Sequence, residues 1–201
     1  MSQRRLEEQA FDAFARRHGL ARDRAETALP VRGYVEGVQL SISKVDRGLT
    51  GNPWMTTQFL ATAPYAIPGG LVAYKPNFRW RFSGARRIQD SVGVGGLIGF
   101  VHHDPVGDPE LDKKLVVYAD DVPLARALLT TPAVKAAILA ALSRAGHIRI
   151  HESRVALEVS ERRRGAVALL ASPEEVEALA LAATAVVRAL CAAVAGYGRR
   201  G

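Results

Sequence analysis

The sequence predicts an α+β fold: a leading helix and an antiparallel sheet in the first half, then a strand, a helix, a hairpin and a last helix. Near both ends of the chain, apolar residues recur every three or four positions, which is the spacing of a helix packed along one face. Between them, short segments alternate apolar and polar residues, which is the spacing of a half-buried strand. The chain has 201 residues, 48% hydrophobic and 23% charged. This composition favours a globular protein over a disordered or fibrous one.

The first half is predicted to be a helix followed by short strands. Leu6, Ala10 and Phe14 form an apolar helical stripe, and Gly19 is a suitable stop for the helix. The alternation of apolar and polar side chains that follows predicts a sheet with one wet face. Its strands are expected at residues 38–43, 55–63, 71–75 and 77–82.

The second half begins with a short apolar strand at residues 115–118. Asp120 or Asp121 can cap the next helix, which has Pro123 in its first turn. A hairpin is expected at residues 147–151 and 154–158.

Two further helices are indicated by a capping residue followed by proline. Thr131 and Pro132 predict a helix that runs to about Arg144. Ser172 and Pro173, followed by two acids, predict the start of the last helix. One long apolar face is expected along that helix. It consists of Val176, Leu179, Ala180, Ala183, Val187, Leu190 and Val194.

Three ranges describe the expected domain organisation. Residues 1–90 form a lobe of helix and antiparallel sheet, and residues 110–201 form an α+β lobe that ends in the long helix. Residues 91–109 are rich in glycine and form the connector. The two lobes either remain separate or pack as one domain.

The net charge of +7 lies mostly in the first half of the chain, because residues 1–100 hold 14 basic and eight acidic side chains. A basic half suggests an anionic partner such as nucleic acid or a lipid headgroup. However, Arg outnumbers Lys by 22 to five and Ala is abundant, a composition that a GC-rich genome produces without selection for binding. Both explanations stay open.

We expect a cytoplasmic protein without a transmembrane segment. Residues 1–20 lack the apolar core of a signal peptide. The most apolar stretch, residues 178–187, is about half as long as the ~20 residues that a bilayer requires. The one cysteine, Cys191, excludes a disulfide scaffold and a cysteine-cluster metal site, and is expected to be a reduced core thiol.

The glycine-rich run at residues 93–99 does not fit a nucleotide-binding motif. A dinucleotide fingerprint needs glycine at its first, third and sixth places, and the sixth place counted from Gly93 is Ile98. A phosphate loop needs a lysine after its last glycine, and none follows here. The run is therefore expected to be a connector or a turn, and no cofactor is expected.

Histidines give one weak indication of a metal site. His102, His103 and Asp104 are residue types that bind Zn, Mn or non-haem Fe, but neighbouring histidines on an extended chain point to opposite faces. His147 and His151 alternate with isoleucines, which predicts a solvated strand face rather than a site. No metal ligand or catalytic residue is assigned.

A basic segment at residues 75–87 contains five Lys or Arg side chains and no acid. If residues 77–82 form a strand, the aromatic residues share one face and the arginines the other. Binders of single-stranded nucleic acid interleave both kinds on one face, so this arrangement favours core aromatics with solvated arginines. Anion binding stays the alternative. The candidate anion-binding residues are Lys75, Arg79, Arg81, Arg86 and Arg87.

Residues 107–118 read Gly-Asp-Pro-Glu-Leu-Asp-Lys-Lys-Leu-Val-Val-Tyr, and Asp-Asp, Ala-Arg and Leu-Leu-Thr follow them. Over residues 107–160, this order resembles a family of uncharacterised bacterial proteins with the pattern Gly-Asp-Pro-x-Phe-Asp, then Asp-Asp, Ala-Arg and Leu-Leu-Thr-Pro. Leu111 and Leu115 stand where that family often has Phe. The resemblance implies a helix, a hairpin and often a last helix, and no activity. Many members are linked to membrane segments, which are not expected here.

The same motif has a physical interpretation. Gly107, Asp108 and Pro109 are predicted to turn into the strand, and Asp112 to accept backbone N–H groups across that turn. Each conspicuous polar residue then has a structural role.

The leading hypothesis is a non-enzymatic cytoplasmic protein that acts by binding another protein, through the sheet or through an exposed part of the last helix. The alternatives are an anion-binding module that uses the basic segment at 75–87, with nucleic acid or acidic lipid as partner, and a metal-dependent enzyme at residues 102–104.

Overall fold

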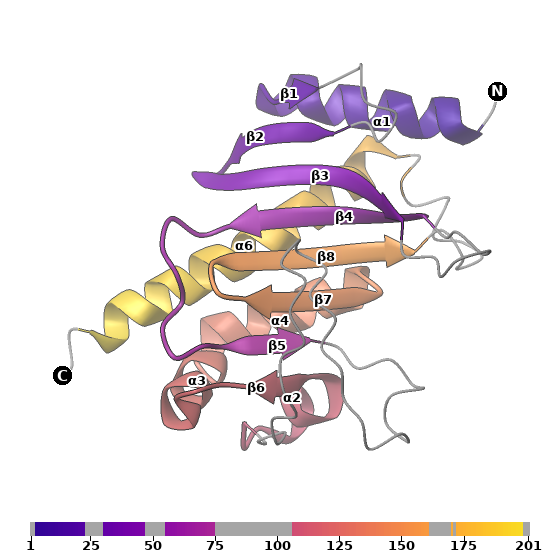
Figure 1. The fold of residues 1–201 in the computed structure, drawn as a ribbon. Coiled ribbons are helices and arrows are strands. Elements are labelled where there is room, and N and C mark those ends of the chain that lie inside the picture. Colours follow the sequence, from indigo (N-terminus) through magenta and orange to yellow (C-terminus); the bar gives the residue numbers. More distant parts are fainter. Residues whose placement is uncertain are drawn as a thin grey trace.

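An antiparallel sheet backed by helices forms the fold of this computed structural model (Figure 1). The structure describes residues 3–22, 30–46, 55–74, 106–160, 170 and 172–198. Within these residues the sheet has eight strands in the order β1-β2-β3-β4-β8-β7-β5-β6. The predicted α+β class and the N-terminal helix are confirmed.

The strands are mostly short and end close to where the alternation of apolar residues ends. They are β1 (Ala21–Arg22), β2 (Val31–Val35), β3 (Val38–Asp46), β4 (Met55–Thr62), β5 (Val72–Tyr74), β6 (Val116–Tyr118), β7 (His147–His151) and β8 (Arg154–Ser160). The described helices are α1 (Gln3–His18), α2 (Pro109–Lys114), α3 (Val122–Leu129), α4 (Pro132–Arg144) and α6 (Pro173–Tyr197).

Strands from both halves of the chain share this sheet. β4 pairs with β8, and β5 lies between β7 and β6. Residues that were expected in two lobes, 1–90 and 110–201, therefore hydrogen-bond to one another across the middle of one sheet. Of the connector expected at 91–109, residues 91–105 lie outside the described residues.

α1 packs where the apolar stripe predicts. Ala10 and Phe14 are buried, and the helix ends at His18, just before Gly19, whose φ of +64° is the left-handed conformation that glycine adopts readily. The Leu20 N–H then donates to the Ala15 carbonyl oxygen at 2.8 Å, which satisfies an end group of the helix.

The helix caps are confirmed in position but only partly in chemistry. The Asp121 carboxylate accepts the Leu124 N–H at 2.9 Å and caps α3, as predicted. Thr131 and Ser172 do precede α4 and α6. Their hydroxyls instead donate elsewhere: Thr131 to the Ala127 carbonyl at 2.9 Å, and Ser172 to the Glu174 carboxylate at 2.6 Å.

The prediction that residues 107–109 turn directly into a strand is wrong, because a short helix intervenes. Asp108 accepts the N–H groups of Glu110 and Leu111, at 3.0 and 3.2 Å, and so caps α2 with Pro109 in its first turn. Asp112 accepts the N–H groups of Val106 and Gly107, as predicted. A cap satisfied by a carboxylate and a proline favours helix over strand at this point.

α6 is much longer than the ten-residue apolar stretch suggests, and by length and composition alone it could cross a membrane. α3 and α4 together also pass that test but are bent by 75°. In this fold, α6 lies behind the sheet across β3, β4 and β8 (Figure 1). Its buried residues are Val176, Leu179, Ala180, Ala183, Thr184, Val186, Val187 and Leu190.

Gly69 and Gly70 lie before β5 and contact the segment that follows β6. The Gly69 carbonyl accepts the N–H groups of Asp120 and Asp121, at 2.9 and 3.2 Å, so the chain before β5 is bound to the chain after β6. Gly70 has a φ of +59°, and a Cβ there would collide with the Asp120 carboxylate.

Replacing Gly70 with Ala is therefore expected to lower the free energy of unfolding by about 1–3 kcal/mol, through backbone strain and displacement of Asp120. Urea unfolding followed by circular dichroism measures the change. Gly196→Ala is the control, because a Cβ there meets nothing within 4 Å and alanine favours the helix. Equal stability of the two variants would contradict the proposed strain.

A charge network joins α2 to α4. Lys135 Nζ lies 2.6 Å from Asp108 Oδ2 and 3.5 Å from Glu110 Oε2. The hydrogen bond from Lys135 holds the pKa of Asp108 below its usual value, and the capped N–H groups act in the same direction. Asp108 also raises the pKa of Lys135.

A carboxyl group with a lowered pKa in the folded state stabilises the fold above its unfolded pKa, and this contribution is lost as the pH falls through the folded pKa. Asp108→Asn keeps a capping oxygen but loses the charge. We expect it to be less stable than the wild type at pH 7, with a difference that shrinks below about pH 4. Urea unfolding at several pH values tests this. A difference that is constant with pH would contradict it.

Candidate functional site

Two surfaces of the described structure have features beyond those of a folded core: the helix-free face of the sheet and the end of α6. Among the described residues, the helices that pack on the sheet lie on one of its faces, and Figure 1 looks onto the other. Side chains alternate between these faces along each strand. Phe59 and Leu157 face the helices, and Gln58 and Glu158 therefore face the other way.

The strand register arranges the helix-free face into rows. Register partners across four strand pairs form an outer row, and the residues two positions along each strand form a middle row. The outer row is Tyr34, Gln39, Thr62, Arg154 and His151, and the middle row is Arg32, Ser41, Leu60, Ala156 and Arg149.

The next row holds a buried acid. Glu158 is 3% exposed, accepts a hydrogen bond from Gln58 Nε2 at 3.1 Å, and lies 3.6 Å from an Arg149 nitrogen. Its register partner on β7 is His147. Burial of a carboxylate is costly unless it is paired, so these contacts account for its place in the sheet.

Exposure changes across the face. Thr56, Gln58 and Glu158 are buried, whereas Arg154 and His151 are half-buried. Towards β2 the side chains become more accessible: Arg32, Tyr34 and Gln39 are exposed, Tyr34 at 68%. The accessible part of the face therefore lies along the outer row and the β2 end of the middle row.

The end of α6 is the second surface. The helix extends past the ends of the strands (Figure 1), and no side chain between positions 191 and 197 is fully buried. Ala192, Ala195 and Tyr197 are exposed, Tyr197 at 51%. No residue between positions 189 and 198 carries a charge.

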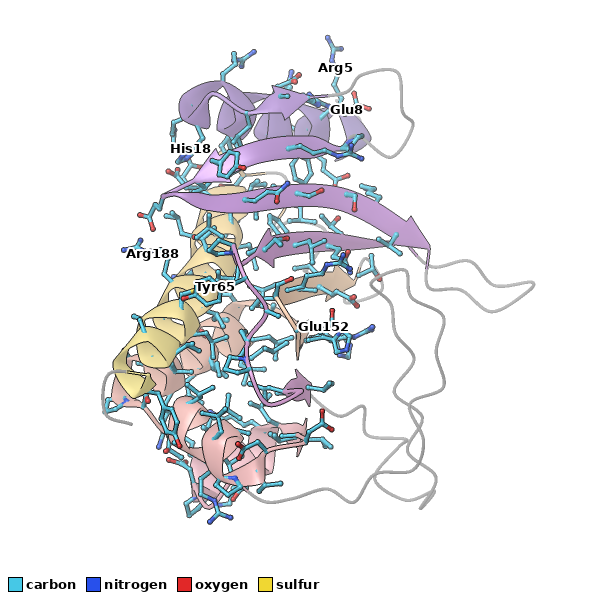
Figure 2. All side chains as sticks on the ribbon, turned by 60° about the vertical axis from the view of Figure 1, so that its left-hand side comes forward. Arg5, Glu8, His18, Tyr65, Glu152 and Arg188 are labelled. Carbon is cyan, nitrogen blue, oxygen red and sulfur yellow. The ribbon has the colours of Figure 1, made fainter. Side chains whose placement is uncertain are left out.

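Tyr65 extends this surface from the loop between β4 and β5. Its hydroxyl donates to the Cys191 carbonyl at 3.1 Å, and its side chain is 43% exposed (Figure 2). One turn before, Arg188 forms an ion pair with Glu36 in the turn between β2 and β3. Cys191 itself is half-buried, so it lies at the border of the core rather than inside it.

Three segments that the sequence made candidates for a site or a connector lie outside the described residues. They are the basic segment (Lys75, Arg79, Arg81, Arg86 and Arg87), the metal alternative (His102, His103 and Asp104) and the glycine-rich run at 93–99. His147 and His151 do lie on β7, on one face with an arginine, as predicted. Within the described part of the chain, no group of three metal-ligating side chains comes together.

Sequence reasoning missed the buried Glu158. The alternation along residues 154–160 places it on the polar face of its strand, so its orientation was predictable. Its contact with Gln58 joins positions 100 residues apart, and no local pattern indicates such a pair.

No family model matches the chain, and no curated protein or solved structure is detectably similar to it. The resemblance of residues 107–160 to a bacterial family therefore stays a prediction.

Glu158→Ala removes the acceptor of the Gln58 amide and the carboxylate beside Arg149. We expect a loss of about 3 kcal/mol in the free energy of unfolding. A double-mutant cycle with Gln58→Ala, measured by urea unfolding, is expected to give a coupling of about 1 kcal/mol, since the two side chains interact directly. If the two losses simply add, the pair contributes nothing.

Proposed function

We propose that this is a non-enzymatic cytoplasmic protein that acts by binding another protein, and that the end of α6 with Tyr65 is the binding surface. The observation that supports it is an uncharged helix end, left exposed beyond the sheet. Contiguous apolar surface on a soluble protein favours an interaction site. The earlier part of the same helix packs its apolar face against the core.

The composition of this surface fits a protein partner. Tyrosines are enriched in interfaces because they combine a large apolar ring with a hydroxyl, and charged side chains are depleted from interface centres. Tyr65 and Tyr197 are both about half exposed. The hydrogen bond to Cys191 and the ion pair of Arg188 hold the neighbouring loops in place, so little ordering is needed on binding.

The test is a pull-down with the full chain from nuclease-treated native lysate, with the bound proteins identified by mass spectrometry. Ala192→Glu combined with Ala195→Glu places two charges on the proposed surface. We expect a stoichiometric partner that the wild type retains and this variant loses, because an unpaired charge at an interface centre must be desolvated.

The matched control is Ala136→Glu with Ala140→Glu, two exposed alanines on α4. This variant is expected to retain the partner. Loss of the partner from both variants, or from neither, would contradict the proposal, as would a wild type that captures nothing.

A further inference from the structure

We propose that the outer and middle rows of the helix-free face bind single-stranded nucleic acid. The proposal is independent of the protein-binding surface, because the two use different side chains on different elements. It also does not use the basic segment at residues 75–87. It rests on the combination of an exposed aromatic ring and several basic side chains on one face of the sheet.

The β2 end of the face supplies both contacts that a single strand needs. Arg32 and Tyr34 are two residues apart on one strand, so both project from the same face, and both are exposed. A base can stack on the tyrosine ring while the arginine contacts a phosphate. In the basic segment at residues 75–87, the sequence predicts aromatics and arginines on opposite faces, whereas Arg32 and Tyr34 share one face.

The rows continue this chemistry across the sheet. From Tyr34 to His151 the outer row crosses four strand spacings, about 19 Å at ~4.8 Å each. Gln39 and Thr62 offer hydrogen-bond groups in the middle of that path, and Arg154 lies beside His151 on β8 and β7, before the register continues to Val72 on β5. A nucleic-acid strand laid along this path therefore meets Arg32 near β2 and Arg154 with His151 on β8 and β7.

The charge of the face favours an anion. Among the described residues of the outer, middle and next rows, the arginines are Arg32, Arg149 and Arg154, and the one acid is Glu158, which is buried and paired with Arg149. Two further acids border the face in the turns. Glu36 forms an ion pair with Arg188, and Glu152 is exposed next to His151. By formal charge, the described residues of the outer and middle rows are therefore basic.

The aromatic ring distinguishes a nucleic acid from other polyanions. Phosphate contacts alone would suit an acidic lipid or any polyanion equally well. A tyrosine that is 68% exposed beside an arginine adds a stacking platform that an unpaired base can use and a lipid phosphate or a fully paired duplex cannot.

The experiment is fluorescence anisotropy of the full chain with a labelled 12-nucleotide single strand at stepped salt concentrations. We expect affinity that falls as salt rises. Arg32→Glu with Arg154→Glu is expected to weaken binding at least tenfold and to reduce the slope of log affinity against log salt by about 1.4, since two phosphate contacts are lost. Tyr34→Ala is expected to weaken binding about tenfold and leave the slope unchanged.

The matched control carries the same change of charge on α1: Arg5→Glu with Arg16→Glu, both exposed, with Arg5 pointing outward in Figure 2. It is expected to weaken binding less than threefold. Three results would overturn the proposal. The first is no salt-dependent binding, and the second is an equal loss of affinity in the two double variants. The third is an affinity for anionic vesicles or duplex DNA that equals the affinity for the single strand and is unchanged by Tyr34→Ala. Because Tyr34 is exposed, its loss tests stacking without threatening the fold.

Discussion

Burial of α6 against the sheet is the contact on which the remaining structure depends. Ala180 and Ala183 are buried and have little side chain to hold the helix away from its neighbours, and Leu179, Val187 and Leu190 are buried with them. Each such aliphatic side chain stabilises the fold by about 1.5–3 kcal/mol when fully buried. Because this one helix crosses β3, β4 and β8, it joins strands from both halves of the chain on a single core.

Local patterns accounted for most elements, since their causes are local. Alternation predicted β3, β4 and the β7–β8 hairpin, and capping residues with proline located the starts of α3, α4 and α6. Strands β1 and β2 were missed, because β1 has two residues and β2 contains Gly33, which interrupts its alternation. α2 was missed because the Gly-Asp-Pro turn fits entry into a helix as well as into a strand.

The candidate surfaces were harder to predict than the elements. Which part of the α6 face stays exposed depends on where the sheet ends, and that is a property of the assembled fold. The rows of the helix-free face depend on register, which pairs Gln39 with Thr62 and Thr62 with Arg154. The face on which each side chain lies follows from alternation within a strand, but its neighbours do not.

The pairing of β4 with β8 has a consequence for how the chain folds during synthesis. β4 is complete at residue 62, yet its second partner begins at residue 154. At about 5–20 residues per second, the ribosome leaves this edge of β4 without β8 for several seconds. Non-local strand pairing also slows folding itself, because a long loop must close first. The nascent chain is therefore expected to rely on chaperones more than a protein whose strands pair in chain order.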